Sequence, residues 1–201
     1  RFSAQEPCSE PPNSKKPALI FFTTQRSAVQ RIYLSAPPDD ANVDQSPPTK
    51  ATDMKVAKMS RGCIRLNADQ RDVVCLRESS NQQYMFIAEG PETGLSVALA
   101  MPDHSVYVAL GVNNIEFFGS SFQSIDQTST AVWCRENDAS PPATSSRILA
   151  GLRSRFPRVI EWFPPEQYND FNDIHQKHPG SEGSRIIAES FALLDARKRR
   201  I

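Results

Sequence analysis

The sequence has few of the residues that build common metal and disulfide sites. It contains four cysteines in 201 residues, and no two of them form a Cys-x-x-Cys pair. This spacing is neither that of a cysteine-based zinc site nor that of a disulfide scaffold. Cys63 and Cys75 could approach each other across a hairpin, but we expect buried free thiols.

Glycine and histidine are also scarce, with eight and three residues respectively. The sequence has no glycine-rich phosphate loop and no nucleophile elbow. His175 and His178 have a spacing that can hold a metal on a helix, but they lie in a polar segment without cysteine. The acidic residues form no recognisable acid/base pair. We therefore expect no catalytic residue, no metal site and no cofactor, and we do not expect an enzyme.

Long apolar runs are absent, because a membrane helix needs about 18 apolar residues and no run approaches that length. We expect no membrane partner. The sequence begins at Arg1 instead of methionine. A removed organellar transit peptide would leave such an end, and so would a cloning boundary.

The net charge is zero, so the chain has no overall basic signature for nucleic acid, but the charges are segregated. Residues 11–77 hold 11 basic and 6 acidic side chains, a net of +5. Residues 78–146 hold Arg135 against 8 acidic side chains, a net of −7. A neutral chain with a basic block can still present a positive face.

The segment from Ala18 to Ala36 is rich in β-branched and aromatic residues and lacks glycine and proline, which is typical of a strand. It exceeds the usual strand length of about 5–6 residues, so we expect it to be bent or bulged. Arg26 and Arg31 lie among hydroxyl and amide side chains without an acid. Such groups suit phosphate and sugar oxygens, although a half-solvated strand would have the same composition.

The other segments predict a strand-rich body followed by helices. Residues 1–17 are expected to form a flexible arm, and the proline-rich residues 37–54 a mobile loop. The body would contain two sets of four strands, the second of which could include a short helix at 102–110 in place of a strand. After the long strand, the predicted strands are 55–66, 72–78, 83–88, 95–101, 105–110, 115–118 and 130–135.

The spacing of apolar residues becomes helical from Ser145 onward. It predicts one amphipathic helix over 145–163, kinked at Pro157 and ended by Pro164 and Pro165. Residues 165–183 are polar and irregular, and a second helix is predicted over 184–200. We therefore divide the chain into an arm at 1–17, a body at 18–163 and a C-terminal extension at 164–201.

This order of elements resembles that of the Whirly family of single-stranded nucleic-acid-binding proteins. Local matches are Gln25-Arg-Ser-Ala-Val29 in place of the family's basic Lys-Gly-Lys-Ala-Ala-Leu stretch, Gly62-Cys-Ile-Arg-Leu66, and Phe156-Pro-Arg-Val-Ile-Glu-Trp162 near the end of the closing helix. The basic stretch has lost both lysines and its glycine. The resemblance implies an α+β fold of two roughly four-stranded antiparallel sheets packed with C-terminal amphipathic helices.

Within that family, the neutral, proline-rich chain is most similar to the paired mitochondrial RNA-binding proteins of trypanosomes. As the less basic subunit, it would join a more basic homologous Whirly-fold subunit in a heterotetramer in the mitochondrial matrix. The resemblance implies binding of guide RNA through its phosphates, which would leave the bases free to anneal with pre-mRNA during RNA editing. Alternatives are a structural subunit of an organellar complex and a single-stranded DNA-binding factor, since RNA and DNA are not separated here.

The basic side chains of the strand-rich first half are the candidate RNA contacts, because phosphate binding by lysine and arginine needs no base sequence. Aromatic residues Tyr33, Tyr84 and Phe86 could stack bases, although strand aromatics are more often part of a core. The candidate RNA-binding residues are Lys15, Lys16, Arg26, Arg31, Lys55, Lys58, Arg61, Arg65, Arg71 and Arg77.

Overall fold

The computed structural model describes residues 18–22, 28–33, 63–65, 73–120, 122, 125–126, 128–137 and 141–198. The chain divides into two compact units, Arg1–Ile20 with Arg31–Gly62 and Phe21–Gln30 with Cys63–Ile201. Within the described residues, no helix is long and apolar enough to cross a membrane.

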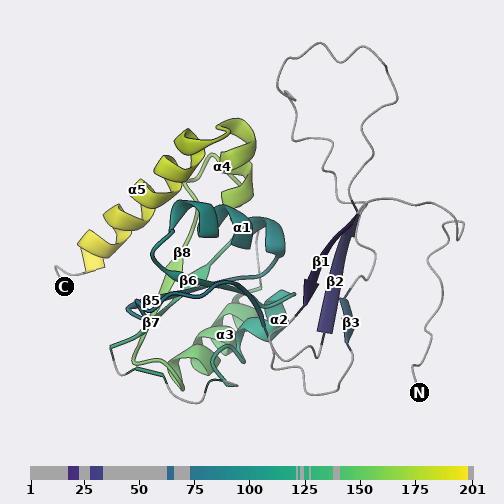
Figure 1. Cartoon of the computed structure of the whole chain (residues 1–201). Coiled ribbons are helices and arrows are strands. Elements are labelled where there is room, and N and C mark those ends of the chain that lie inside the picture. The colour runs from purple at the N-terminus through teal and green to yellow at the C-terminus, as the bar shows by residue number, and fades with distance from the viewer. Residues whose placement is uncertain are drawn as a thin grey trace, which may run out of the picture. The chain divides into compact units, whose positions relative to one another are not determined.

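A small sheet has the order β1-β2-β3 (Figure 1). Its strands are β1 (Ala18–Phe22), β2 (Ala28–Tyr33) and β3 (Cys63–Arg65), and β2 pairs antiparallel with β3. Strands β1 and β2 both fall within the single long strand predicted for 18–36, and the residues between them lie outside the described part. The predicted arm at 1–17 and the predicted loop at 37–54 lie outside it as well.

The larger sheet has five strands in the order β4-β6-β5-β7-β8. Strands β6, β5, β7 and β8 are parallel, whereas β4 pairs antiparallel with β6 at one edge. Figure 1 shows helices on both faces of this sheet. The five strands are β4 (Val74–Arg77), β5 (Tyr84–Ala88), β6 (Ser105–Val108), β7 (Thr130–Cys134) and β8 (Arg158–Trp162).

In the part of the chain that the structure describes, helices α1 to α5 cover the two faces of this sheet and form two apolar layers. One layer joins α1, α4 and α5 to Phe86 and Trp162, and the other joins α2 and α3 to Ile87 and Trp133. Alternate residues of β5 and β7 therefore enter opposite layers, as the pleat of a strand requires. The helices are α1 (Pro91–Ala100), α2 (Val112–Ile115), α3 (Pro142–Arg153), α4 (Phe171–Lys177) and α5 (Ser181–Lys198).

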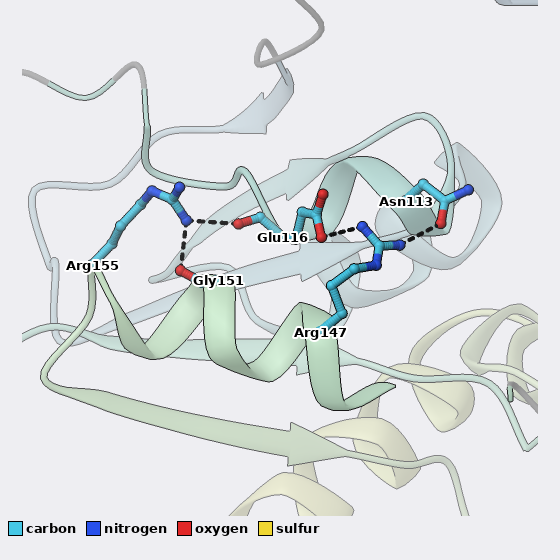
Figure 2. Close-up of polar contacts among 5 residues, drawn as sticks. All are labelled: Asn113, Glu116, Arg147, Gly151 and Arg155. Atoms are coloured by element: carbon cyan, nitrogen blue, oxygen red, sulfur yellow. Dashed lines mark hydrogen bonds and ion pairs between the residues drawn. The ribbon is translucent and has the colours of Figure 1, made fainter. Parts of the chain in front are cut away.

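Two arginines of the α3 region bind the turn that follows α2. Figure 2 shows Arg147 paired with the Glu116 carboxylate and donating to Asn113 Oδ1 at 2.7 Å. Arg155 Nη1 donates to the Glu116 carbonyl oxygen at 2.6 Å and to the Gly151 carbonyl oxygen at 2.5 Å. A Cβ at Gly151 would lie 2.5 Å from that Glu116 oxygen, so the close approach of α3 to this turn requires glycine.

The α+β class is confirmed, but the prediction of two four-stranded antiparallel sheets is wrong. All five residues of β5 and all five of β7 are buried, because helices cover both faces, which is typical of parallel strands. Such strands are joined by crossover helices. Residues 95–100, predicted as a strand, accordingly lie in α1.

Two further elements differ from the sequence prediction. The segment 115–118, predicted as a strand, is the end of α2 and the turn after it. The helix predicted over 145–163 is instead α3 followed by strand β8. Pro157 stands between them, and its ring does more than kink a helix, because it separates two elements of different type. Within 165–183, predicted as irregular, the chain forms α4.

Candidate functional site

The carboxyl ends of β5 and β7 are neighbours in the sheet, with Ala88 paired to Cys134. From β5 the chain enters α1 on one face, and after β7 it enters α3 on the other face. The strand order therefore reverses between β5 and β7. In open α/β sheets, ligands bind outside the carboxyl ends of the strands at such a reversal, so the fold marks this edge as the candidate site.

An acidic residue follows each of these two strands. Glu89 comes directly after β5, and Glu136 is the second residue after β7. Both are partly buried. Asp138 follows in the sequence but lies outside the described residues. The topology thus places two carboxylates at one edge of the sheet.

The backbone around Glu89 is fixed from both sides. The Ala109 N–H donates to the Ala88 carbonyl at 2.9 Å, and the Gly111 N–H donates to the Glu89 carbonyl at 3.1 Å. Helix α1 begins two residues after Glu89, with Pro91 in its first turn. The positive end of the helix dipole at this position favours a negative charge.

Gly94 brings α1 close to the sheet. A Cβ at this position would lie 2.5 Å from Val108 Cγ2 and 2.9 Å from Leu76 Cδ1. Because these two side chains leave no room for a methyl group on residue 94, glycine allows the start of α1 to lie close to the strands. Glu89, just before α1, is positioned by the same approach.

Arg135, directly after β7, is only 8% exposed and its charge is compensated. Its Nη1 lies 2.6 Å from Glu161 Oε2. The guanidinium carbon lies 4.2 Å from the centre of the Trp133 ring and 4.8 Å from that of Phe163. Its backbone N–H donates to the Trp162 carbonyl at 2.8 Å. This buried pair joins the ends of β7 and β8.

Asn137 binds the segment that follows β8. Its backbone N–H donates to the Asn169 carbonyl at 2.7 Å. Its side-chain Nδ2 donates to the carbonyls of Tyr168 and Pro164, at 2.7 and 3.2 Å. The segments after β7 and β8 are thereby held together at the same edge as the two carboxylates.

The acidic side chains at this edge fit a magnesium ion better than a metal held by protein alone. Among the described residues, no three histidine, cysteine, aspartate or glutamate side chains form a group that could hold a metal. Magnesium, however, usually takes one or two carboxylates together with waters and substrate phosphates. Glu89 and Glu136 supply that number of carboxylates.

Of the predicted RNA-binding residues, Arg77 does not lie at this edge. Arg77 is exposed and ends β4, whose carboxyl end lies at the opposite edge because β4 is antiparallel. Arg31 lies in β2 and Arg65 in β3. The other seven lie outside the described residues: Lys15, Lys16, Arg26, Lys55, Lys58, Arg61 and Arg71. Their role in binding RNA stays a prediction.

Several other sequence predictions can be compared with the structure. Tyr84 and Phe86 are not available for base stacking, because they are 5% and 0% exposed and belong to the α1 layer. Tyr84 donates its hydroxyl to Asp195 at 2.7 Å. Cys75 and Cys134 are free thiols, as predicted, but only Cys134 is buried, whereas Cys75 is partly exposed.

His175 and His178, whose spacing could suit a metal, have other hydrogen-bond partners. His175 Nε2 lies 3.0 Å from Ser184 Oγ, and His178 Nε2 lies 2.8 Å from the Tyr168 hydroxyl. His175 thus links α4 to α5, and His178 links the end of α4 to the loop before this helix.

Comparison with known families identifies a likeness that covers this edge. Residues 84–181 match the family model described as "Toprim domain". The matched range begins at the first residue of β5 and includes both acidic segments. No curated protein and no solved structure gave a significant match.

The match overturns the resemblance to the Whirly family. The guide-RNA function in RNA editing and the assignment to the trypanosome proteins rested on that resemblance, so both predictions are wrong as well. The local matches that suggested Whirly are short, and one of them has a structure other than the one expected. Phe156 to Trp162 is mostly β8, not the end of a helix.

Sequence reasoning missed Glu89 and Glu136 as a pair. The signal was present, because each acid follows closely on a run of apolar residues that ends without a polar alternation. Acids in those positions indicate a site only if the two strands are parallel neighbours, and the antiparallel prediction placed them apart.

Proposed function

We propose that residues 84–181 form a divalent-metal-dependent site that processes nucleic acid by phosphoryl transfer. The observation that carries this proposal is the pair Glu89 and Glu136 at the carboxyl ends of adjacent parallel strands, inside a segment that matches a Toprim domain. Toprim domains suggest a metal-binding role in nucleic-acid processing, as in primases, topoisomerases and nucleases. The proposal departs from the expectation of a chain without catalytic activity.

In this proposal, Glu89 and Glu136 would hold the ion by their carboxylates. When bound, a magnesium ion supplies stabilisation of negative charge on a phosphoryl group. The chain's residues do the positioning. The Ala88 and Glu89 carbonyls fix the end of β5 against residues 109–111, and Asn137 fixes the segment after β7.

Arg135, the residue before Glu136, carries a positive charge that is compensated, because its guanidinium is paired with Glu161. The start of α1 beside Glu89 also provides a favourable end of a helix dipole for a substrate phosphate.

The test is an activity assay on labelled single-stranded and double-stranded DNA and RNA with Mg²⁺ or Mn²⁺. We expect Glu89→Gln and Glu136→Gln to reduce the rate by about 100-fold or more, as does loss of other charge-stabilising groups. Glu78→Gln is the matched control, because Glu78 is exposed at the opposite edge of the sheet. Equal rates in all three variants would refute the assignment.

Metal binding provides a second measurement that needs no substrate. A ligand that binds only the folded state raises its stability by about 2.7 kcal/mol at 100 times the dissociation constant. We expect Mn²⁺ to raise the melting temperature of the wild type and of Glu78→Gln, but not of Glu89→Gln. An identical rise in all of them would place the metal elsewhere.

Assembly with a more basic homologous subunit and a place in the mitochondrial matrix stay predictions from the sequence. Sedimentation of the chain with and without such a homologue would test the first, and localisation of a tagged full-length protein would test the second.

A further inference from the structure

Phe163 is an exposed aromatic ring at the edge that carries the acidic residues. It is 44% exposed, although Trp162, which precedes it, and Trp133, on the neighbouring strand β7, are 1% and 2% exposed. It is the first residue after β8, and continuation of the β7–β8 register places it beside Arg135, which immediately precedes Glu136.

The Phe163 ring is held in a fixed position. One contact is the Arg135 guanidinium, 4.8 Å from the ring centre, and that guanidinium is itself fixed by Glu161 and Trp133. The following residue, Pro164, restricts the backbone of Phe163. The Pro164 carbonyl accepts a hydrogen bond from Asn137 Nδ2 at 3.2 Å. An exposed ring that is already ordered loses little entropy when a ligand binds it.

A flat, rigid and exposed ring next to a site for phosphoryl transfer suits a nucleobase. Every base has a π-face, and stacking on aromatic side chains is a general mode of binding single strands. The Arg135 guanidinium beside the ring is paired with Glu161, so its charge is compensated. Stacking needs no net charge, so it can add to the binding that the metal and the start of α1 would give to phosphates.

We propose that Phe163 is a stacking platform for an unpaired nucleobase of a single-stranded nucleic acid bound at the carboxyl edge of the sheet. This inference rests on the proposed function, because it takes the substrate to be nucleic acid. It adds a substrate class, since a base in an intact duplex is covered by its neighbours and cannot stack on a protein ring.

The test is a binding titration of the full chain with labelled single-stranded oligonucleotides, one of DNA and one of RNA, in Ca²⁺ to limit turnover. Stacking contributions of one base predict that Phe163→Ala weakens binding about 5- to 150-fold, whereas Phe163→Tyr, which keeps a flat ring, binds within about 2-fold of wild type. Leu193→Ala is the control, because Leu193 is a 63% exposed apolar side chain on α5.

Phe163→Leu guards against loss of folding, because leucine still covers Arg135 but has no flat π-face. We expect it to melt like the wild type and to bind like Phe163→Ala. The loss should also vary little with salt, unlike the loss of a phosphate contact. DNA and RNA should lose equally if the base alone is recognised, and a loss in one of them only would restrict the platform to that nucleic acid.

Two results would overturn the inference. One is a folded Phe163→Leu or Phe163→Ala that binds single strands as tightly as the wild type. The other is a wild type that binds duplex but not single strands. Neither depends on the activity of the Glu89 and Glu136 variants, so failure here and failure of the metal site can be told apart.

Discussion

Two ion pairs of nearly equal length show how surroundings decide the value of a side-chain contact. Arg135–Glu161 spans 2.6 Å with side chains 9% and 30% exposed, whereas Arg185–Glu189 spans 2.7 Å with both about 60% exposed. Water competes for both partners of the second pair, whereas in the first pair it reaches the glutamate but hardly the arginine. Exposed pairs contribute little to stability, while a buried charge left without its partner is costly.

We therefore expect Glu161→Gln to lower the free energy of unfolding by about 1–3 kcal/mol, because Arg135 would remain buried with a weaker partner. Glu189→Gln, the control, should leave the stability unchanged within the error of urea denaturation. Equal effects of the two substitutions would contradict this difference in burial.

His104 gives the molecule a stability that depends on pH. Its ring lies 5.7 Å from the ring of Tyr84 and 5.6 Å from that of Phe86, and burial lowers the pKa of His104 below the ordinary 6.5. Burial lowers the pKa of His175 as well. The unfolded chain therefore takes up protons more readily than the folded one below about pH 6.5.

The stability that comes from neutral His104 and His175 is full above about pH 6.5 and is lost as the pH falls below it. Urea denaturation at pH 7.5 and 5.5 should show lower stability at the acidic value, and His104→Gln should reduce this difference. A pH difference that is unchanged in His104→Gln would assign it to other groups.

At the level of elements, glycine residues determine how closely a helix packs against its neighbours. Alanine normally stabilises an exposed helix relative to glycine by about 1 kcal/mol. At Gly151 of α3 the added Cβ would meet the Glu116 backbone oxygen at 2.5 Å. Because a backbone carbonyl cannot rotate away as a side chain can, the contact would push α3 from the turn that Arg155 binds.

Gly151→Ala should accordingly destabilise the protein by about 1–3 kcal/mol, the usual cost of overpacking. Ser146→Ala, at an exposed position of the same helix, is the control and should be neutral or slightly stabilising in thermal unfolding. A stabilised Gly151→Ala would mean that helix propensity outweighs the contact.

For the molecule as a whole, protection from solvent should be greatest in the middle of the sheet. Strands β5 and β7 are flanked by strands on both sides and buried along their whole length, while β4 lies at an edge with Arg77 exposed. Hydrogen exchange should therefore be slowest in 84–88 and 130–134 and faster in 74–77. Faster exchange in β5 than in β4 would contradict this order.

The complete burial of the central strands also explains how much of the fold could be predicted from the sequence. Strands β5, β6 and β7 lie inside predicted strands, because short apolar and β-branched runs indicate strands in any sheet. What failed was their pairing. A run buried on both faces has no alternation to show direction, and α1, with Pro91, Thr93 and Gly94 in its first half, has the composition of a loop. Glu89 and Glu136 lie at one edge only if β5 and β7 are parallel neighbours, so the wrong strand pairing also hid the candidate site.

The position of α5 has a consequence for the chain as it is being made. Ile187 and Phe191 of α5 complete the apolar layer that contains Phe86 and Trp162. A ribosome makes the N-terminal part of a chain first, so all five strands leave it before this helix does. Until α5 emerges, the nascent sheet lacks part of the cover on one face. Apolar side chains of this layer such as Phe86 and Trp162 are thus open to association with other chains until α5 has been made.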